Sequence, residues 1–172
     1  MEERKLTREV EAGLEDYAWL SDAVQHPRPQ ITFRDTNVHI EQWRGGQVVD
    51  VRDERNVVVA TGLQETAKLL IGAGTAFGWM GIGIGTTAET ITQTTLISPV
   101  GTDGTTLPTN NVASTATTVA SGDTNEGADT AQYVTTFTFT GSYAITESGV
   151  FNTLARAGAK MLCRKAFSAI NV

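Results

Sequence analysis

The stretch Gln132-Tyr133-Val134-Thr135-Thr136-Phe137-Thr138-Phe139-Thr140 decides the fold class, because its side chains alternate with a period of two. One face carries Tyr133, Thr135, Phe137 and Phe139, and the other carries the smaller set of Val134, Thr136 and Thr138. This is the period of a β-strand, whose successive side chains point to opposite faces of a sheet. The sequence therefore predicts a strand with one well-packed face.

Further short runs of this kind lie on both sides of that stretch, separated by turns rich in Gly, Asn and Asp. The pair Gly45-Gly46 supplies the positive φ angles of a tight hairpin turn, and residues 53–56 are expected to form a polar turn. We therefore expect a mainly β fold, an antiparallel β-sandwich built from residues 31–172. The other predicted strands are 31–33, 38–43, 48–51, 57–59, 79–85, 96–100, 112–120, 143–145 and 159–167.

One packed α-helix is predicted within this β-rich region, at about residues 62–72. Thr61 and Gln64 have the spacing of a capping box, and Gly72 stands where a glycine ends a helix. The apolar residues expected on one side of the helix are Leu63, Ala67, Leu70 and Ile71.

Residues 1–30 are expected to form an N-terminal helical arm and its connector. Apolar residues recur there at helical spacing, and Pro27 and Pro29 stop the helix and stiffen the chain that follows. The apolar stripe must be covered by the domain behind it or by another subunit. Because the connector is stiff, we favour another chain, and expect deletion of residues 1–26 to weaken assembly but leave a folded domain. The stripe consists of Leu6, Val10, Leu14, Tyr17 and Leu20.

Charge divides the sequence into three parts. Residues 1–68 carry 13 acids and 9 bases, residues 69–155 carry 6 acids and no base, and residues 156–172 carry 4 bases and no acid. The net charge of -6 leaves no excess of cations for nucleic-acid phosphates. Apolar runs fall short of the roughly 20 residues that cross a bilayer, and residues 1–5 lack the apolar core of a secretion signal. We expect no nucleic-acid partner and no membrane partner.

The sequence gives little support to catalysis or metal binding. The single cysteine, Cys163, and two histidines have no zinc-ligand spacing, and the serines lack a recognisable nucleophile motif. Cys163 is interpreted as a small buried hydrophobic residue and His39 as a structural residue within a strand. We predict no catalytic residue, no cofactor and no metal.

Two stretches resemble ligand-binding loops but are explained better as structure. Gly81, Gly83 and Gly85 alternate with apolar residues, so they are expected on one face of a strand, where the helix at 62–72 or an opposing strand packs closely on Gly83. A nucleotide loop would open a helix instead. Asp123, Asn125, Gly127 and Asp129 stand at alternate positions as in a calcium loop, but the twelfth residue, where that loop needs a glutamate, is Val134, which favours a turn at 123–129.

The basic cluster near the C-terminal end has two interpretations. It is a solvated face, or it meets the acidic surface of a neighbouring copy, with Arg164 and Lys165 as the candidate interface residues. In the second case, replacing both by Glu should slow assembly without destabilising the domain. The cluster consists of Arg156, Lys160, Arg164 and Lys165.

Four segments, in this order, resemble a family of small virion structural proteins of tailed bacteriophages. They are VRDERNVVV at 51–59, WMGIGIGTTA at 79–88, AITESGVFN at 144–152 and MLCRKAF at 161–167, so the resemblance spans about residues 50–170. It implies a non-enzymatic virion component, a symmetric oligomer whose partners are its own copies and other capsid or tail proteins. Without a long repetitive shaft, a head-surface or vertex position (decoration or fibre base) is favoured slightly over a tail-fibre or baseplate adaptor.

A carbohydrate-binding β-sandwich module is the alternative from another class. It would present Trp43, Trp79 or Tyr133 on an open face. An enzyme such as a wall hydrolase ranks third.

Overall fold

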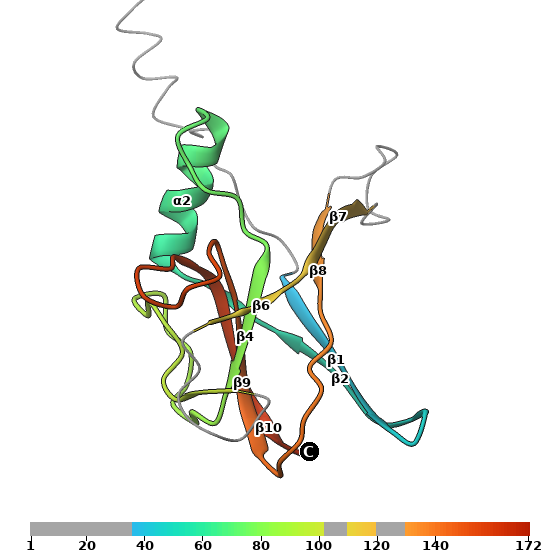
Figure 1. The fold of residues 1–172 in the computed structure, drawn as a ribbon. Helices are drawn as coiled ribbons and strands as arrows, with labels where there is room; N and C mark the ends of the chain where they lie inside the picture. The colour runs from blue at the N-terminus through green and yellow to red at the C-terminus, as the bar shows by residue number, and fades with distance from the viewer. Residues whose placement is uncertain (1–35, 102–109, 120–129) are drawn as a thin grey trace, which may run out of the picture. The chain divides into compact units, whose positions relative to one another are not determined.

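The computed structural model describes residues 36–101, 110–119 and 130–172 (Figure 1). All of them belong to one compact unit, Asp35–Val172. The predicted arm, the strand at 31–33 and the turn at 123–129 lie outside the described residues. The described chain is mainly β, with antiparallel sheets and one packed α-helix, which confirms the predicted class.

The largest sheet has six strands in the order β3-β10-β9-β4-β5, with β6 paired to β4 (Figure 1). All its pairings are antiparallel. Its strands are β3 (Val57–Val58), β4 (Trp79–Gly83), β5 (Pro99–Val100), β6 (Val112–Ala113), β9 (Ala144–Phe151) and β10 (Met161–Asn171).

Two hairpins accompany this sheet. In the first, β1 (Asn37–Arg44) pairs with β2 (Gln47–Arg55) through the predicted turn, where Gly45 and Gly46 have φ values of 55° and 79°. Residues 53–55 were expected in a turn but continue β2, because Asn37 to His39 of β1 pair with them. In the second hairpin, β7 (Thr115–Val119) pairs with β8 (Thr130–Val134).

The stretch 135–140 differs from its prediction in one respect. Tyr133, Thr135, Phe137 and Phe139 are half-buried and the residues between them are exposed, so the predicted alternation is present. The strand nevertheless ends at Val134, and 135–140 joins no ladder among the described residues.

The helix α2 (Ala60–Leu70) begins two residues before its predicted start. Thr61 is inside its first turn and donates a hydrogen bond to the Met161 carbonyl, so it is not the N-cap. Gly72 has a φ of 71° just after the helix, as expected. The helix packs on β10 at Gly62, where an added Cβ would lie 2.7 Å from Leu162 Cα.

Apolar side chains are buried on both sides of the main sheet. Phe151 belongs to a cluster with Val59, Leu96 and Met161, whereas its neighbour Val150 belongs to a second cluster with Phe77 and Cys163. Successive residues of a strand point to opposite faces, so β9 is covered on both faces. Its residues from Ile145 to Phe151 are all buried, including three polar ones.

Candidate functional site

Glu147, at the centre of β9, is a buried acidic side chain with four hydrogen-bond donors around it. It is fully buried, and its Oε1 accepts hydrogen bonds from the backbone N–H groups of Gly85 at 3.1 Å and Ser98 at 2.7 Å. Its Oε2 accepts from the Ile97 N–H at 3.1 Å and from Arg164 Nε at 2.8 Å. Four donors therefore neutralise and fix this carboxylate, which makes it a structural group.

Arg164, on β10, is the fully buried partner of Glu147. Its Nη2 also lies 2.8 Å from Glu147 Oε2, without hydrogen-bond geometry. On its other side, Nη1 donates to the Thr87 carbonyl at 2.9 Å and to Gln93 Oε1 at 3.1 Å. Arg164 thus connects the Glu147 carboxylate to the middle of the segment 84–98.

Gly83, the last residue of β4, and Gly85, two residues after it, make room for this pair. An added Cβ at Gly83 would lie 2.5 Å from the Ser98 carbonyl oxygen, and one at Gly85 would lie 2.6 Å from Glu147 Oε1. Gly81 faces Asn111 and Phe151 instead. The close approach expected at Gly83 is present, but it comes from the Glu147 carboxylate and Ser98 and not from α2.

The contacts of Glu147 and Arg164 hold a segment with little regular structure in one conformation. We call residues 84–98 the clamped loop. Thr146 Oγ1 adds a hydrogen bond to the Gly85 carbonyl, and Lys165 pairs with Glu89 at 3.0 Å. The clamped loop is therefore fixed near its start, its middle and its end.

The clamped loop presents apolar side chains to solvent. Ile84, Ile91 and Ile97 are 43%, 53% and 48% exposed, although Leu96 between them is buried. The Ile91 carbonyl accepts a hydrogen bond from Ala60 N–H at the start of α2. A rigid loop with exposed isoleucines loses little conformational entropy on binding, so it is suited to packing against another protein surface.

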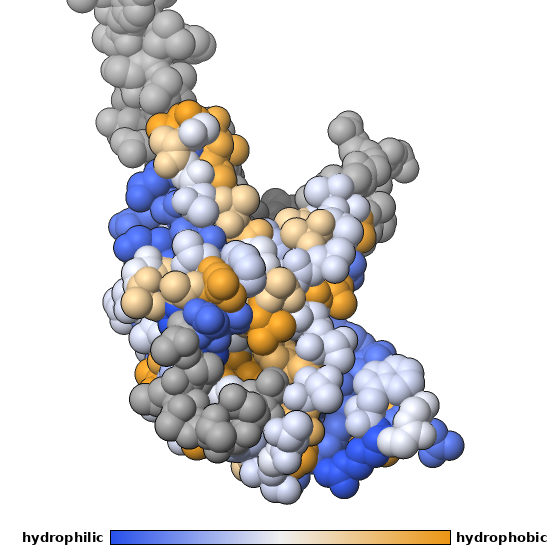
Figure 2. Space-filling view, viewed as in Figure 1, coloured by the Kyte–Doolittle hydropathy of each residue, from blue (hydrophilic) through white to orange (hydrophobic). Residues whose placement is uncertain are grey.

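The helix α2 has exposed apolar side chains of its own, at its C-terminal end. Leu70 and Ile71 are 67% and 79% exposed, and Figure 2 shows apolar surface at that end of the helix. The four residues expected to pack inward, Leu63, Ala67, Leu70 and Ile71, are all exposed. The helix instead buries Gly62 and Glu65. The Glu65 carboxylate accepts a hydrogen bond from Thr75 N–H, which together with Lys68 lowers its pKa.

The basic cluster does not form the free cationic surface that was considered for contacts between copies. Arg164 is buried against Glu147, and Lys165 pairs with Glu54 at 3.4 Å as well as with Glu89. Arg156 is half-buried and donates to the Asn110 carbonyl; its pKa is lowered by burial. Replacing Arg164 and Lys165 by Glu would therefore break ion pairs within the domain and destabilise it. The sequence had predicted slower assembly with no loss of stability.

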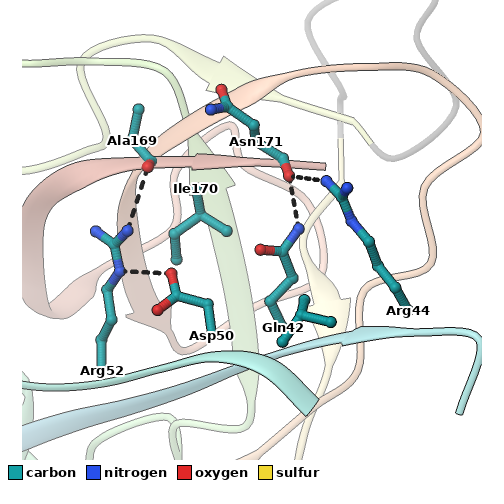
Figure 3. Close-up of a pocket in the computed structure, with 8 residues that line it drawn as sticks. Gln42, Arg44, Asp50, Arg52, Ala169, Ile170 and Asn171 are labelled. Atoms are coloured by element: carbon teal, nitrogen blue, oxygen red, sulfur yellow. Dashed lines mark hydrogen bonds and ion pairs between the residues drawn. The ribbon is translucent and has the colours of Figure 1, made fainter. Parts of the chain in front are cut away.

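A shallow pocket lies where the β1–β2 hairpin meets the last residues of β10 (Figure 3). Its side chains are already used by β10: Gln42 Nε2 and Arg44 Nη2 donate to the Asn171 carbonyl at 2.6 and 2.7 Å. Arg52 donates to the Ser168 and Ala169 carbonyls and pairs with Asp50. These side chains cover the end of β10 and protect it from pairing with another chain. We therefore interpret the pocket as a structural contact between the hairpin and β10, and call it the seam.

The remaining candidate residues fall into three groups. Leu6, Val10, Leu14, Tyr17 and Leu20 lie outside the described residues. Cys163 is buried, as expected for a small hydrophobic residue, and burial raises its thiol pKa to about 12. Of the aromatic residues considered for carbohydrate binding, Trp43 is exposed, whereas Trp79 and Tyr133 are half-buried.

Sequence reasoning missed the Glu147–Arg164 pair. Both residues occur in strands that otherwise carry mostly uncharged side chains around them, Glu147 in AITESGVF and Arg164 in MLCRKAF. A single acid in one apolar strand, with bases in a second strand that is otherwise apolar, is the signal that could have indicated a buried ion pair.

Comparisons with protein families, curated proteins and solved structures found no match to this chain. Among residues 36–101, 110–119 and 130–172, no group of three or more His, Cys, Asp or Glu side chains is placed to hold a metal ion. The described part of the chain has no helix with the length and apolar character needed to cross a membrane.

Proposed function

We propose that this chain is a non-enzymatic structural subunit of a tailed-phage virion, and that it assembles as a symmetric oligomer with the clamped loop at the contact between copies. The observation that carries the proposal is the exposure of Ile84, Ile91 and Ile97 on a loop that a fully buried ion pair holds rigid. Exposed apolar side chains on a rigid segment are typical of surfaces that are covered on assembly.

The segments that resemble virion proteins support the proposal by their positions. The glycine motif begins in β4, the 144–152 motif forms β9 and the 161–167 motif begins β10, and these three strands are neighbours in one sheet. Glu147 and Arg164, from two of the motifs, hold Gly85 and Thr87, which belong both to the glycine motif and to the clamped loop. In this proposal, the three motifs together fix the conformation of the clamped loop and expose its isoleucines.

In its specific form, the proposal places the protein at the head surface or a vertex, as a decoration protein or fibre base. Its partners there are its own copies and the capsid proteins beneath it. A position as a tail-fibre or baseplate adaptor is the second choice within the same class.

Incorporation into particles tests this function. Antibody labelling of particles purified from a host carrying the gene should place the protein on the virion, with labels at the head rather than the tail. The pair of substitutions Ile91→Ser and Ile97→Ser should reduce incorporation, because it removes apolar area from the loop without touching Glu147 or Arg164. Val134→Ser, at a comparably exposed residue of β8, is the matched control. Particles that lack the wild-type protein would contradict the proposal.

A further inference from the structure

The outer face of the β1–β2 hairpin is a second exposed surface, separate from the clamped loop. The register pairs His39 with Asp53 and Trp43 with Val48 across the two strands, and Glu41 lies between the two β1 residues. All five side chains are exposed, and Trp43 is 58% exposed. The Trp43 indole lies near the turn of this extended ribbon, where it is a flat apolar platform with polar groups beside it.

A chain of polar contacts orients this platform. Asp53 Oδ1 lies 2.8 Å from His39 Nδ1, and His39 Nε2 lies 3.3 Å from Glu41 Oε1. The other carboxylate oxygen of Glu41 accepts the Trp43 indole N–H at 2.9 Å. The indole therefore has its only donor satisfied and its ring held in place, so a ligand that stacks on it need not order it first.

The opposite face of the same hairpin fixes it to the domain. Gln42, Arg44 and Arg52 hold the carbonyl groups at the end of β10, so the ribbon is anchored through one face. Alternation along the strands then directs His39, Glu41 and Trp43 away from that seam. The outer face is thus both supported and accessible.

The charges of this face suit a neutral ligand with many hydroxyl groups. The two carboxylates flank one imidazole, and their hydrogen bonds, that of Asp53 first, raise the His39 pKa. A protonated His39 offsets part of their negative charge. What remains is a row of strong acceptors beside an aromatic ring, which matches hydroxyl donors and polarised C–H groups.

We propose that the outer face of the β1–β2 hairpin binds a saccharide, with a pyranose ring stacked on Trp43 and its hydroxyl groups donating to Glu41 and Asp53. The axial C–H groups of a pyranose are weakly positive and pack on the negative face of an aromatic ring. An extended ribbon favours an extended, β-linked chain over a coiled, α-linked one. This activity does not depend on the proposed assembly through the clamped loop.

Binding of soluble oligosaccharides to the full-length protein tests the site. The probes are cellohexaose and chitohexaose, which are β-linked, and maltohexaose, which is α-linked, with affinity measured by calorimetry. We expect a β-linked probe to bind more tightly than maltohexaose, and Trp43→Ala to weaken that binding by about tenfold or more, or about 1.4 kcal/mol. Val51→Ala, on the same face, should change it less, and Trp43→Phe should retain part of it.

Two results would overturn the proposal: failure of the wild-type protein to bind either β-linked probe, or equal affinities for wild type and Trp43→Ala. A thermal melt of each variant separates loss of the site from loss of the fold. Because the clamped loop is untouched, the oligomeric state should be the same for all these variants, so failure of the saccharide proposal leaves the assembly proposal standing.

Discussion

The pair Glu147–Arg164 and the trio Asp53–His39–Glu41 each bring acidic and basic side chains of two neighbouring strands together, but they differ in burial. The first is fully buried, and its oxygens are occupied by four protein donors. The second is exposed, and its carboxylates remain accessible to a ligand. Burial therefore decides whether charged side chains only stabilise the fold or can also bind a ligand.

The largest effect is expected from breaking the buried pair. Arg164→Met should lower the free energy of unfolding by about 3–5 kcal/mol, because it leaves a buried carboxylate without its partner. The double variant Glu147→Gln with Arg164→Met should recover part of the loss, since no unpaired charge remains and an amide oxygen can still accept hydrogen bonds from the backbone N–H groups of Gly85, Ile97 and Ser98. Urea denaturation of both variants measures this, and a single variant as stable as the wild type would show that the pair is not needed.

A smaller effect is expected from filling the space beside the pair. Gly83→Val should cost roughly 1–3 kcal/mol, because the new side chain meets the Glu147 carboxylate and the Ser98 carbonyl. Gly78→Val is the matched control, since an added Cβ there would meet no atom of the described chain within 4 Å. Thermal unfolding of both variants measures this, and the midpoint of Gly83→Val should be the lower of the two. Equal midpoints would show that the glycine stripe is not closely packed.

The smallest effect is expected at the exposed group. The hydrogen bonds from Asp53 and Glu41 raise the His39 pKa above 6.5. A histidine with a raised folded-state pKa stabilises the fold fully below pH 6.5, and this contribution is lost as the pH rises through the folded-state value. An NMR titration of His39 in a His26→Gln background should give a pKa above 6.5, which Asp53→Asn should lower. A value at or below 6.5 would show that these contacts do not form in solution.

Local sequence signals predicted the parts of the fold that depend on local geometry. Gly45-Gly46 and Gly72 have the positive φ values that their positions indicated, and the mainly β class follows from the two-residue period. The helix start was wrong for a tertiary reason. The Ala60 N–H donates to the Ile91 carbonyl, so a distant backbone group takes the place of the capping side chain that the spacing of Thr61 and Gln64 predicted.

The candidate site could be predicted only in part. The alternation of Gly81, Gly83 and Gly85 correctly indicated a close approach, but not what approaches. Arg164 was assigned to a surface cluster because three other bases surround it in sequence. Its burial follows from strand order, which brings Gly149 opposite Arg164 and thereby places Glu147 two residues along the neighbouring strand. Sequence spacing alone does not contain that register.

The mass of the full-length protein in solution tests the central claim, assembly through the clamped loop, most directly. Light scattering on the wild type should give a multiple of the 18.4 kDa chain mass, and the Ile91→Ser, Ile97→Ser variant should shift toward a single chain while Val134→Ser does not. A wild-type mass of one chain across the accessible range of protein concentration would contradict the account, as would a loop variant that assembles as well as the wild type.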